Sequence, residues 1–369
     1  MVSNNKVISI AHLIYRLDVG GLERVMINCI NHLPSNGYQH IIISLTTASD
    51  FAKQLTGDID IIALDKRPGA DLSLHKRLYN VLRGRNVDIL HTYNLATVEY
   101  HPVARLAGIK GHIHAEHGRD IYDPEGKNWK HNLLRKIVSP FIDYFVPVSQ
   151  DLESWLIEKV GISARNVKLI YNGINLDKFK CSDNAKNNAI TRFATIARLS
   201  PIKDQQMLLR GFAAFLLLEP NANAELCVIG DGELKAQLMA LSKQLNLGQK
   251  VQFLGERNDI PELLQTFDVF VLTSLAEGIP MTILEAMASG VPIISTRVGG
   301  IPEIIEHDVQ GLLIEKSDIQ GLGEAMRYYC SNSDVRHRHG LDAVKKVEKL
   351  FSEAAMVQQY QQLYQTVRT

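Results

Sequence analysis

Apolar, β-branched segments alternate with helical segments along this chain, in two successive series. The first series of apolar segments is KVISIAHLIY, QHIIISLT, IDIIAL, VDILHTYN, GHIHAEHG, DYFVPVS and VKLIYNG, with helical stretches such as 71–84 and 95–107 between them. The second series is FATIAR, AELCVIG, VQFLG, DVFVLTS, VPIISTR and GLLIE. Strands that alternate with helices form parallel sheets covered by helices. The pattern therefore predicts an α/β protein with two Rossmann-like, doubly wound domains.

The two series meet near residues 172–192, which include the polar stretch KCSDNAKNNAITR. A chain of 369 residues is long enough for two domains with full cores. We expect an N-terminal domain over 1–171 and a C-terminal domain over 172–351, with a last helix over 352–369 that can pack back on the first domain. Ligands of such sheets bind at the carboxyl ends of the strands, so the domains are expected to face each other across a cleft.

Charge and cysteine content exclude several kinds of partner. Lys plus Arg is 40 and Asp plus Glu is 40, so no global field attracts nucleic acid. The cysteines Cys29, Cys181, Cys227 and Cys330 are scattered without metal-ligand spacing, as is typical of buried thiols in a reducing compartment. The first residues, MVSNNKVISIAHLIY, do not resemble an export signal, and FAAFLLL is too short to span a bilayer. These features predict a cytoplasmic protein.

The segment EGIPMTILEAMASG (277–290) holds two glutamates with seven residues between them. Pro280 suits the first turn of a helix, good helix formers follow, and Gly290 ends the helix. We expect Glu277 in the loop after the strand DVFVLTS and Glu285 about one turn into the helix. The helix N-terminus between them is an anion site. It suits a ligand that is anionic in its middle and hydroxylated at both ends, although a dipole-stabilising glutamate and a surface glutamate are the plain alternative.

In this setting EGIPMTILE resembles the E-x7-E signature of glycosyltransferase family 4, a family of retaining enzymes with the GT-B fold. The glycine-rich loop DVGGLERV, the interdomain segment IYNGIN, the basic loop ARLSPIKD, and VIGDGE, VQFLGE and VGGIPEII resemble the family's motifs in the expected order over nearly the whole chain. YRLDVGGLERVMINCINHLP and AEHGRDIYD are most similar to bacterial exopolysaccharide-assembly enzymes. Asn175 departs from the family's usual aspartate after NGI. The resemblance implies an acceptor-binding first domain and a nucleotide-sugar-binding second domain.

The resemblance also implies a donor site for a nucleotide sugar, which we expect to be a UDP-sugar. Glu277 would hold the transferred sugar and Glu285 the ribose, while Arg198 and Lys203 would stabilise the leaving diphosphate. The expected donor site is completed by groups near Gly278, Ile279 and Thr282 and by the loop with Gly20 and Gly21. Without the resemblance, the basic pair would be ordinary solvated residues and the Gly20–Gly21 loop a plain turn.

Histidines near strand ends are further candidates. His117 matches the family's active-site histidine, so the resemblance implies contact with the donor sugar, and we group it with Glu277, Arg198 and Lys203 as catalytic. His91 and Asn94 are weaker candidates, and Asp120 either contacts the acceptor or caps a turn. The residues Gly299 and Gly300 are interpreted as a plain turn.

The mechanism implied by the resemblance is transfer with retention, without a metal or cofactor. No general base for an inverting reaction stands out beyond His117. The DID at 58–60 resembles the metal-binding DxD of another glycosyltransferase fold, but it lies inside a predicted strand and is interpreted as structural. The expected acceptor is a glycan or a lipid-linked sugar.

Other classes of protein remain as alternatives. An NDP-sugar epimerase or hydrolase of the same fold would act without an acceptor. A solute-binding protein would carry an export signal, and a dehydrogenase would carry G-x-G-x-x-G, which DVGGLE lacks.

The segment KNWKHNLLRKIV (127–138) predicts a helix with an apolar stripe and a local positive charge. The stripe is Trp129, Leu133 and Ile137, widened by Leu134 and Val138, and the basic residues are Lys127, Lys130, Arg135 and Lys136. Basic amphipathic helices bind anionic membranes. Peripheral membrane contact through 127–138 is therefore one prediction, and packing of the apolar stripe on the sheet is its alternative.

Overall fold

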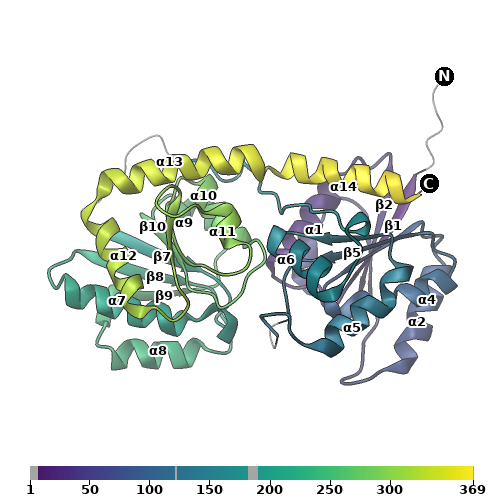
Figure 1. Cartoon of the computed structure of the whole chain (residues 1–369), viewed down its shortest axis with the longest axis horizontal. Coiled ribbons are helices and arrows are strands. Elements are labelled where there is room, and N and C mark those ends of the chain that lie inside the picture. The colour runs from purple at the N-terminus through teal and green to yellow at the C-terminus, as the bar shows by residue number, and fades with distance from the viewer. Residues whose placement is uncertain (1–6, 121–122, 182–189, 369) are drawn as a thin grey trace. The chain divides into compact units, whose positions relative to one another are not determined.

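The computed structural model describes residues 7–120, 123–181 and 190–368. The chain divides into two compact units: unit 1 contains residues 1–173 and 353–369, and unit 2 contains residues 174–352. Each unit has one six-stranded sheet in which every strand pair is parallel (Figure 1). The predicted α/β architecture of two doubly wound domains is confirmed.

Unit 1 has the strand order β3-β2-β1-β4-β5-β6. Its strands are β1 (Ile8–Ile14), β2 (Tyr38–Ser44), β3 (Asp60–Ala63), β4 (Ile89–Tyr93), β5 (Gly111–Glu116) and β6 (Tyr144–Pro147). Its α-helices are α1 (Gly21–His32), α2 (Leu72–Arg83), α3 (Leu95–Val98), α4 (His101–Leu106), α5 (Trp129–Val138), α6 (Gln150–Ser154) and α14 (Glu353–Arg368). Shorter turns are η1 (Asp50–Gln54), η2 (Ser139–Phe141), η3 (Trp155–Val160, a π-helix) and η4 (Ala164–Asn166).

Unit 2 has the strand order β12-β11-β10-β7-β8-β9. Its strands are β7 (Thr191–Ile196), β8 (Ala224–Ile229), β9 (Val251–Gly255), β10 (Val269–Leu272), β11 (Ile293–Thr296) and β12 (Gly311–Ile314). Its α-helices are α7 (Gln205–Leu218), α8 (Lys235–Gln244), α9 (Ile260–Leu264), α10 (Met281–Ala288), α11 (Ile301–Ile304), α12 (Ile319–Ser331) and α13 (Ser333–Leu350), with the 3₁₀ turns η5 (Pro201–Lys203) and η6 (Gly248–Lys250).

The two faces of the unit 1 sheet bury different kinds of side chain. On one face, Leu13 and Leu90 join Leu78 of α2 and Ala104 of α4 in an apolar core. On the other face lies α14, which also contacts α1. There His91 Nδ1 lies 2.8 Å from the Tyr364 hydroxyl of α14. The last helix is thus part of the core of unit 1.

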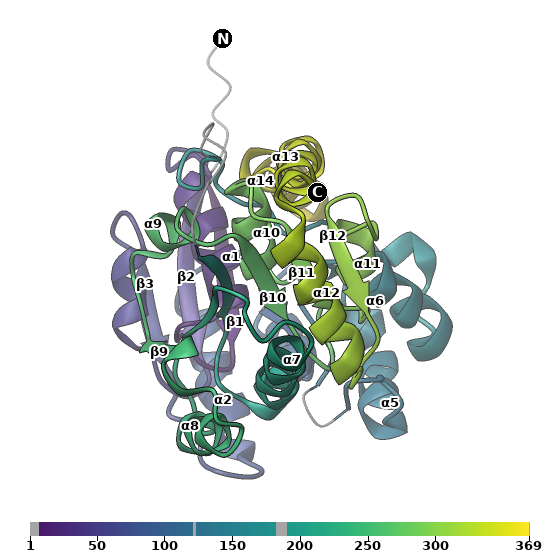
Figure 2. The same ribbon diagram turned by 90° about the vertical axis from the view of Figure 1, so that its left-hand side faces the viewer.

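The main cluster of buried side chains in unit 2 is apolar and is covered by two helices that lie side by side. Residues of β7, β8 and β10 pack against α7 and α12, including Phe193, Phe212 and Leu322. The close packing of α7 on α12 is visible in Figure 2. Strands β7 and β10 are neighbours in this sheet, so the loops that follow them lie at the same edge.

Three sequence predictions need correction. VKLIYNG forms no strand; only Val167 makes an isolated bridge, to Phe145 at the end of the sheet. The helix predicted over 95–107 is two short helices, because Pro102 opens α4 and a proline lacks the N–H that a continuing helix needs. The DID does not lie inside a strand, since β3 begins at its second aspartate, Asp60; both aspartates are exposed.

Other sequence predictions agree with the structure only in part or fall on residues that it does not describe. Cys29 and Cys227 are buried thiols, whereas Cys181 and Cys330 are partly exposed; none of the four forms a disulfide. Parts of the N-terminal segment (1–6), of AEHGRDIYD (121–122) and of the interdomain polar stretch (182–189) lie outside the described residues. Across the described residues, no helix has the length and apolar character needed to cross a membrane.

Candidate active site

The loops after β7 and β10 bring a lysine and a glutamate together in unit 2. Lys203 Nζ lies 2.5 Å from Glu277 Oε1, and the Ser274 hydroxyl donates to the same oxygen at 2.6 Å. The side chains of Lys203 and Glu277 are 23% and 10% exposed. A carboxylate held between an ammonium and a hydroxyl has a fixed orientation, and the Glu277 side chain remains partly exposed.

Backbone contacts hold these two loops in register. The Thr273 hydroxyl donates to the carbonyls of Lys203 and Asp204 at 3.1 and 2.9 Å. Leu275 N donates to Ile202 O at 2.8 Å. Asp204 has the left-handed φ of 43° and caps α7 by accepting from Met207 N at 3.2 Å. The position of Lys203 is therefore determined by the start of α7 on one side and by the β10 loop on the other.

Gly299 is packed against the backbone of Glu277. Its φ is 52°, and a Cβ at this position would lie 1.8 Å from the Glu277 carbonyl oxygen. Gly300 N donates to that oxygen at 3.4 Å. The interpretation of this glycine pair as a plain turn omits its contact with Glu277. Only glycine fits the left-handed backbone of Gly299 in such close contact.

Helix α10 starts directly after the Glu277 loop. It begins at Met281 with no side-chain cap, so its first N–H groups, including that of Thr282, lack an intrahelical acceptor. Gly278 and Ile279, just before the helix, are buried. The positive end of the helix and the side chain of Lys203 thus both lie beside Glu277, which is an arrangement suited to an anion.

Glu285 lies in the middle of α10 and is 0% exposed. The alternative of a surface glutamate at this position is therefore wrong. A buried carboxylate costs solvation free energy that an apolar residue would not cost.

Arg198 lies in the loop after β7 and is exposed. The buried Gln205 side chain donates to its carbonyl oxygen at 2.9 Å. The same loop is contacted by VIGDGE: Gly230 has a φ of 126°, and a Cβ there would lie 2.1 Å from Ala197 O. Leu199 N also donates to Asp231 O at 2.9 Å. The basic loop is consequently fixed by its backbone, while the guanidinium of Arg198 remains accessible.

His117 follows β5 in unit 1. Its N–H donates to Asn94 Oδ1 at 2.8 Å, and its ring lies 5.9 Å from that of Tyr93. Both ring nitrogens are shielded from solvent, and neither is hydrogen-bonded to a described residue. Burial lowers the pKa of His117 to about 4, although Glu116 opposes this shift. The imidazole is therefore neutral at pH 7 and able to donate or accept a hydrogen bond.

The structure also locates four other predicted residues of unit 1. Asn94 positions the His117 backbone, whereas His91 is buried in the core beside Tyr364 of α14 and is a packing residue. Gly20 and Gly21 begin α1; Gly20 has an extended backbone, and a Cβ there would meet the flexible Glu23 side chain. The Glu23 side chain therefore lies against the backbone at Gly20, at the start of α1.

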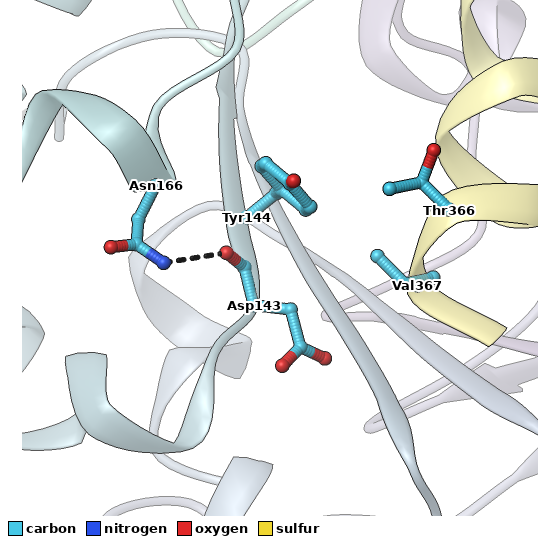
Figure 3. Close-up of a pocket in the computed structure, with 5 residues that line it drawn as sticks. All are labelled: Asp143, Tyr144, Asn166, Thr366 and Val367. Carbon is cyan, nitrogen blue, oxygen red and sulfur yellow. Dashed lines mark hydrogen bonds between the residues drawn. The ribbon is translucent and has the colours of Figure 1, made fainter. Parts of the chain in front are cut away.

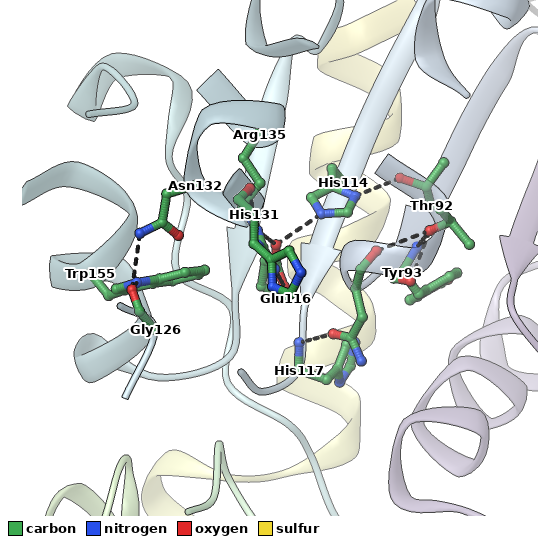
Figure 4. Close-up of polar contacts among 12 residues, drawn as sticks. Thr92, Tyr93, His114, Glu116, His117, Gly126, His131, Asn132, Arg135 and Trp155 are labelled. Carbon is green, nitrogen blue, oxygen red and sulfur yellow. Dashed lines mark hydrogen bonds and ion pairs between the residues drawn. The ribbon is translucent and has the colours of Figure 1, made fainter. Parts of the chain in front are cut away.

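Helix α5 departs from the predicted basic face at Arg135 and from the packing alternative along its apolar stripe. Arg135 is 2% exposed, and its Nε lies 2.5 Å from Glu116 Oε1 (Figure 4). It therefore does not belong to a solvated basic face. The alternative that the apolar stripe is packed is wrong for Trp129, Leu133 and Ile137, which are 66%, 45% and 61% exposed, whereas Leu134 is half-buried and Val138 is buried.

A cavity of about 350 Å³ lies elsewhere in unit 1 (Figure 3). It is lined by Asp143, Tyr144, Asn166, Thr366 and Val367. Asp143 and Tyr144 stand at the amino end of β6, whereas ligands of parallel sheets bind at the carboxyl ends. This cavity is therefore at the wrong edge of the sheet to serve His117.

Sequence reasoning missed the residues that hold the candidate ones in place. Ser274 and Thr273 at the end of β10 and the pair Glu116–Arg135 were not predicted to hold these residues, and Gly299 was interpreted only as a turn. The available signal was hydroxyl residues directly after a buried strand. In the part of the chain that the structure describes, no group of three or more His, Cys, Asp or Glu side chains is arranged to hold a metal ion.

Two family models match consecutive parts of the chain. Residues 19–178 match the model "Glycosyltransferase Family 4", and residues 179–346 match the model "Glycosyl transferases group 1". Together the two matched segments extend through both units.

Similar proteins agree with these matches. UDP-Gal:alpha-D-GlcNAc-diphosphoundecaprenol alpha-1,3-galactosyltransferase of Escherichia coli is 28% identical, over 95% of this chain and 97% of that protein. N-acetyl-alpha-D-glucosaminyl L-malate synthase of Bacillus anthracis is 28% identical over 81% and 80%. The solved structure of Anabaena Alr3699/HepE with UDP and glucose has a TM-score of 0.82 at 21% identity, covering 97% of this chain and 100% of that one. The last likeness shows a shared fold.

Proposed function

Because this chain belongs to the GT-B glycosyltransferases of family 4 and group 1, we propose that it transfers a hexose or N-acetylhexosamine from a UDP-sugar to a glycan or lipid-linked acceptor. The transfer proceeds with retention of anomeric configuration and without a metal. The observation that carries the proposal is the pairing of Lys203 with Glu277 beside the uncapped start of α10.

The donor is proposed to bind along these groups in unit 2. Lys203, Arg198 and the first N–H groups of α10 interact with the diphosphate, whose negative charge increases as the bond to the sugar breaks. Glu277 accepts hydrogen bonds from the sugar hydroxyls, and Glu285 accepts them from the ribose. The Lys203–Glu277 contact then gives way to contacts of each side chain with the donor.

In the chemical step the bond from the anomeric carbon to the diphosphate oxygen breaks, and the acceptor oxygen bonds to the same face of that carbon. The departing phosphate oxygen takes the acceptor proton. For His117 we propose contact with the donor sugar, where the neutral imidazole offers one donor and one acceptor. At the start of α1, we propose that ligand groups approach the backbone of Gly20 and Gly21 once the Glu23 side chain moves aside.

A lipid-linked acceptor is supported by two observations. The similar Escherichia coli enzyme is named for an acceptor attached to diphosphoundecaprenol. In this chain, α5 exposes Trp129, Leu133 and Ile137 with Lys130 and Lys136 beside them. Apolar side chains next to lysines suit the headgroup region of an anionic membrane. We therefore propose that α5 contacts the membrane that carries the acceptor and that the protein acts at the cytoplasmic face.

The function is tested by incubating the protein with UDP-galactose, UDP-glucose or UDP-N-acetylglucosamine, with and without a diphosphoundecaprenol-linked sugar. UDP release that requires the acceptor, and a product with the anomeric configuration of the donor, are the expected results. An inverted product would contradict retention. UDP release or epimer formation from the donor alone would indicate a hydrolase or epimerase instead.

A further inference from the structure

A chain of buried hydrogen bonds runs between the sheet of unit 1 and α4. It starts at the carbonyl of Ile109 and ends at the carboxylate of Glu116. Along it, the bonds join Ile109 O to His112 Nε2 (3.1 Å), His112 Nδ1 to His101 Nδ1 (3.0 Å), His101 Nε2 to Thr92 Oγ1 (2.8 Å), Thr92 Oγ1 to His114 Nδ1 (2.6 Å), and His114 Nε2 to Glu116 Oε1 (3.1 Å). All four side chains between the two ends are 0% exposed. Figure 4 shows His114 between Thr92 and Glu116.

Both ends of this chain can only accept hydrogen bonds. A backbone carbonyl has no proton to donate. Glu116 is ionised: burial raises its pKa, but Arg135 and His114 outweigh burial and lower that pKa to about 2. Arg135 Nε also donates to the same oxygen that His114 contacts. Each of the five bonds must therefore obtain its hydrogen from the four groups between the ends.

Counting protons gives a definite result. A neutral histidine supplies one ring proton and a threonine hydroxyl supplies one, so His112, His101, Thr92 and His114 supply four in their neutral forms. Five bonds need five. One of the three imidazoles must therefore carry both ring protons.

The surrounding charges select which imidazole this is. Glu116, the only carboxylate in the chain of bonds, contacts His114. Burial lowers the pKa of His112 to about 4 and that of His101 well below its ordinary value. The other titratable neighbours of His114 are His91 on β4, His101 on α4 and His117, and burial lowers the pKa of each one. Arg135 on α5 is held by Glu116 and by the ring of Trp155, at 4.8 Å.

We propose that His114 is a buried imidazolium and that its extra proton positions the Glu116–His117 backbone. The proton completes the bond chain from α4 through β4 to β5, and Glu116 extends it to α5. His117 follows Glu116 directly, and Glu116 O accepts from Val148 N at 3.2 Å. His114 is thus a positioning residue for His117. The last step rests on the proposed function of His117; the protonation of His114 does not.

The first test reads the protonation directly. Nitrogen-15 NMR of the histidine-labelled protein at pH 7 is expected to show one solvent-shielded imidazole with both ring nitrogens protonated. Thr92→Val removes the two hydrogen bonds of the Thr92 hydroxyl. The three bonds that remain need only the three protons of three neutral imidazoles, so His114 should become neutral with its proton on Nε2. Thr92→Ser keeps the hydroxyl and should retain the imidazolium. A His114 with a bare ring nitrogen in the parent protein, or identical spectra of the two variants, would overturn the proposal.

The second test separates positioning from folding and from donor binding. Thr92→Val is expected to lower kcat for transfer by roughly 10–100-fold, because small displacements of a reacting group are costly, while Thr92→Ser restores it. The Kd for UDP, measured by calorimetry, should be the same in both variants. If the parent protein does not bind UDP, the proposed function is refuted, but the protonation of His114 measured by NMR is not affected. Equal kcat in both variants would overturn the positioning role.

Discussion

Lys203 Nζ and Glu277 Oε1 lie 2.5 Å apart, although 74 residues separate them in the chain. They meet because β7 and β10 are neighbours in a parallel sheet, so the loops after both strands lie at one edge. Thr273 ties the two loops through the carbonyls of Lys203 and Asp204. A cation and an anion from two separate loops are thus paired at the edge of the sheet where we propose that the donor binds.

Glu277→Gln is expected to lower kcat/KM for transfer while leaving the protein folded. The substitution replaces a charge-assisted hydrogen bond, worth about 1.5–3 kcal/mol, and therefore costs about 10–150-fold. The ion pair is partly exposed, so its loss should change the free energy of unfolding by only about 0–1 kcal/mol. Steady-state kinetics and thermal unfolding measure both quantities.

A matched control comes from a second ion pair of unit 2. Arg192 Nε lies 2.5 Å from Glu225 Oε1, with 36% and 18% exposure, on strands β7 and β8. Glu225→Gln should leave kcat/KM unchanged. A similar loss in both variants would show that the effect comes from unit 2 as a whole and not from Glu277.

Gly299→Ala is expected to reduce transfer by displacing the Glu277 loop. The new Cβ would overlap the Glu277 carbonyl, and alanine is strained at a φ of 52°. Gly248→Ala is the control, since Gly248 has a φ of 55° and nothing within 4 Å of an added Cβ. Both variants share the backbone cost of about 1–2 kcal/mol, so only the Gly299 variant should lose activity beyond its loss of stability.

Binding to anionic liposomes should depend on the exposed stripe of α5. Trp129→Ser with Ile137→Ser removes apolar contact, and Lys130→Glu with Lys136→Glu removes charge worth about 1 kcal/mol per lysine, or about 30-fold for two. Arg135 is left intact, because it is buried against Glu116. Leu72→Ser, at an 85% exposed site on α2, is the control. Sedimentation that is the same for all four proteins would rule out the membrane contact.

Mild acid should destabilise unit 1. Burial lowers the pKa of His40 and of His117 to about 4, below their ordinary value of 6.5. The unfolded chain then binds protons that the folded chain does not, so the free energy of unfolding falls as the pH decreases from about 6.5 toward 4. His117→Asn should reduce this slope in denaturant titrations. An unchanged slope would mean that His117 is protonated alike in both states.

Glu116 adds a second, more acidic dependence. The pKa of Glu116, lowered from 4.5 to about 2, contributes stability above about pH 4.5 that is lost between pH 4.5 and 2.

The fold was predictable because buried parallel strands are near-continuous apolar runs, which a sequence displays directly. VKLIYNG has the same composition and misled the prediction, since a local pattern does not reveal whether a neighbouring strand is available for pairing. The break between α3 and α4 has a visible signal in Pro102, which the helical periodicity of 95–107 concealed.

Residues of the candidate site could be predicted only where they belong to a recognisable sequence motif. The loop positions of Glu277 and Lys203 could be predicted from strand ends, but their direct pairing depends on the order of strands in the sheet. The complete burial of Glu285 was not predictable, because a helix of eight residues displays no clear polar face when almost all of it is buried. Arg135 looked solvated because its partner, Glu116, lies on a different element.

Calorimetric titration with UDP tests the central claim most directly. The parent protein is predicted to bind UDP at one site, and Lys203→Met is predicted to weaken binding by at least about tenfold, because it removes a charge-assisted contact to the diphosphate. GDP and ADP serve as comparisons for the base. Failure of all three nucleotides to bind the parent, or equal affinity of the parent and Lys203→Met for UDP, would contradict the assignment of this loop to the donor diphosphate.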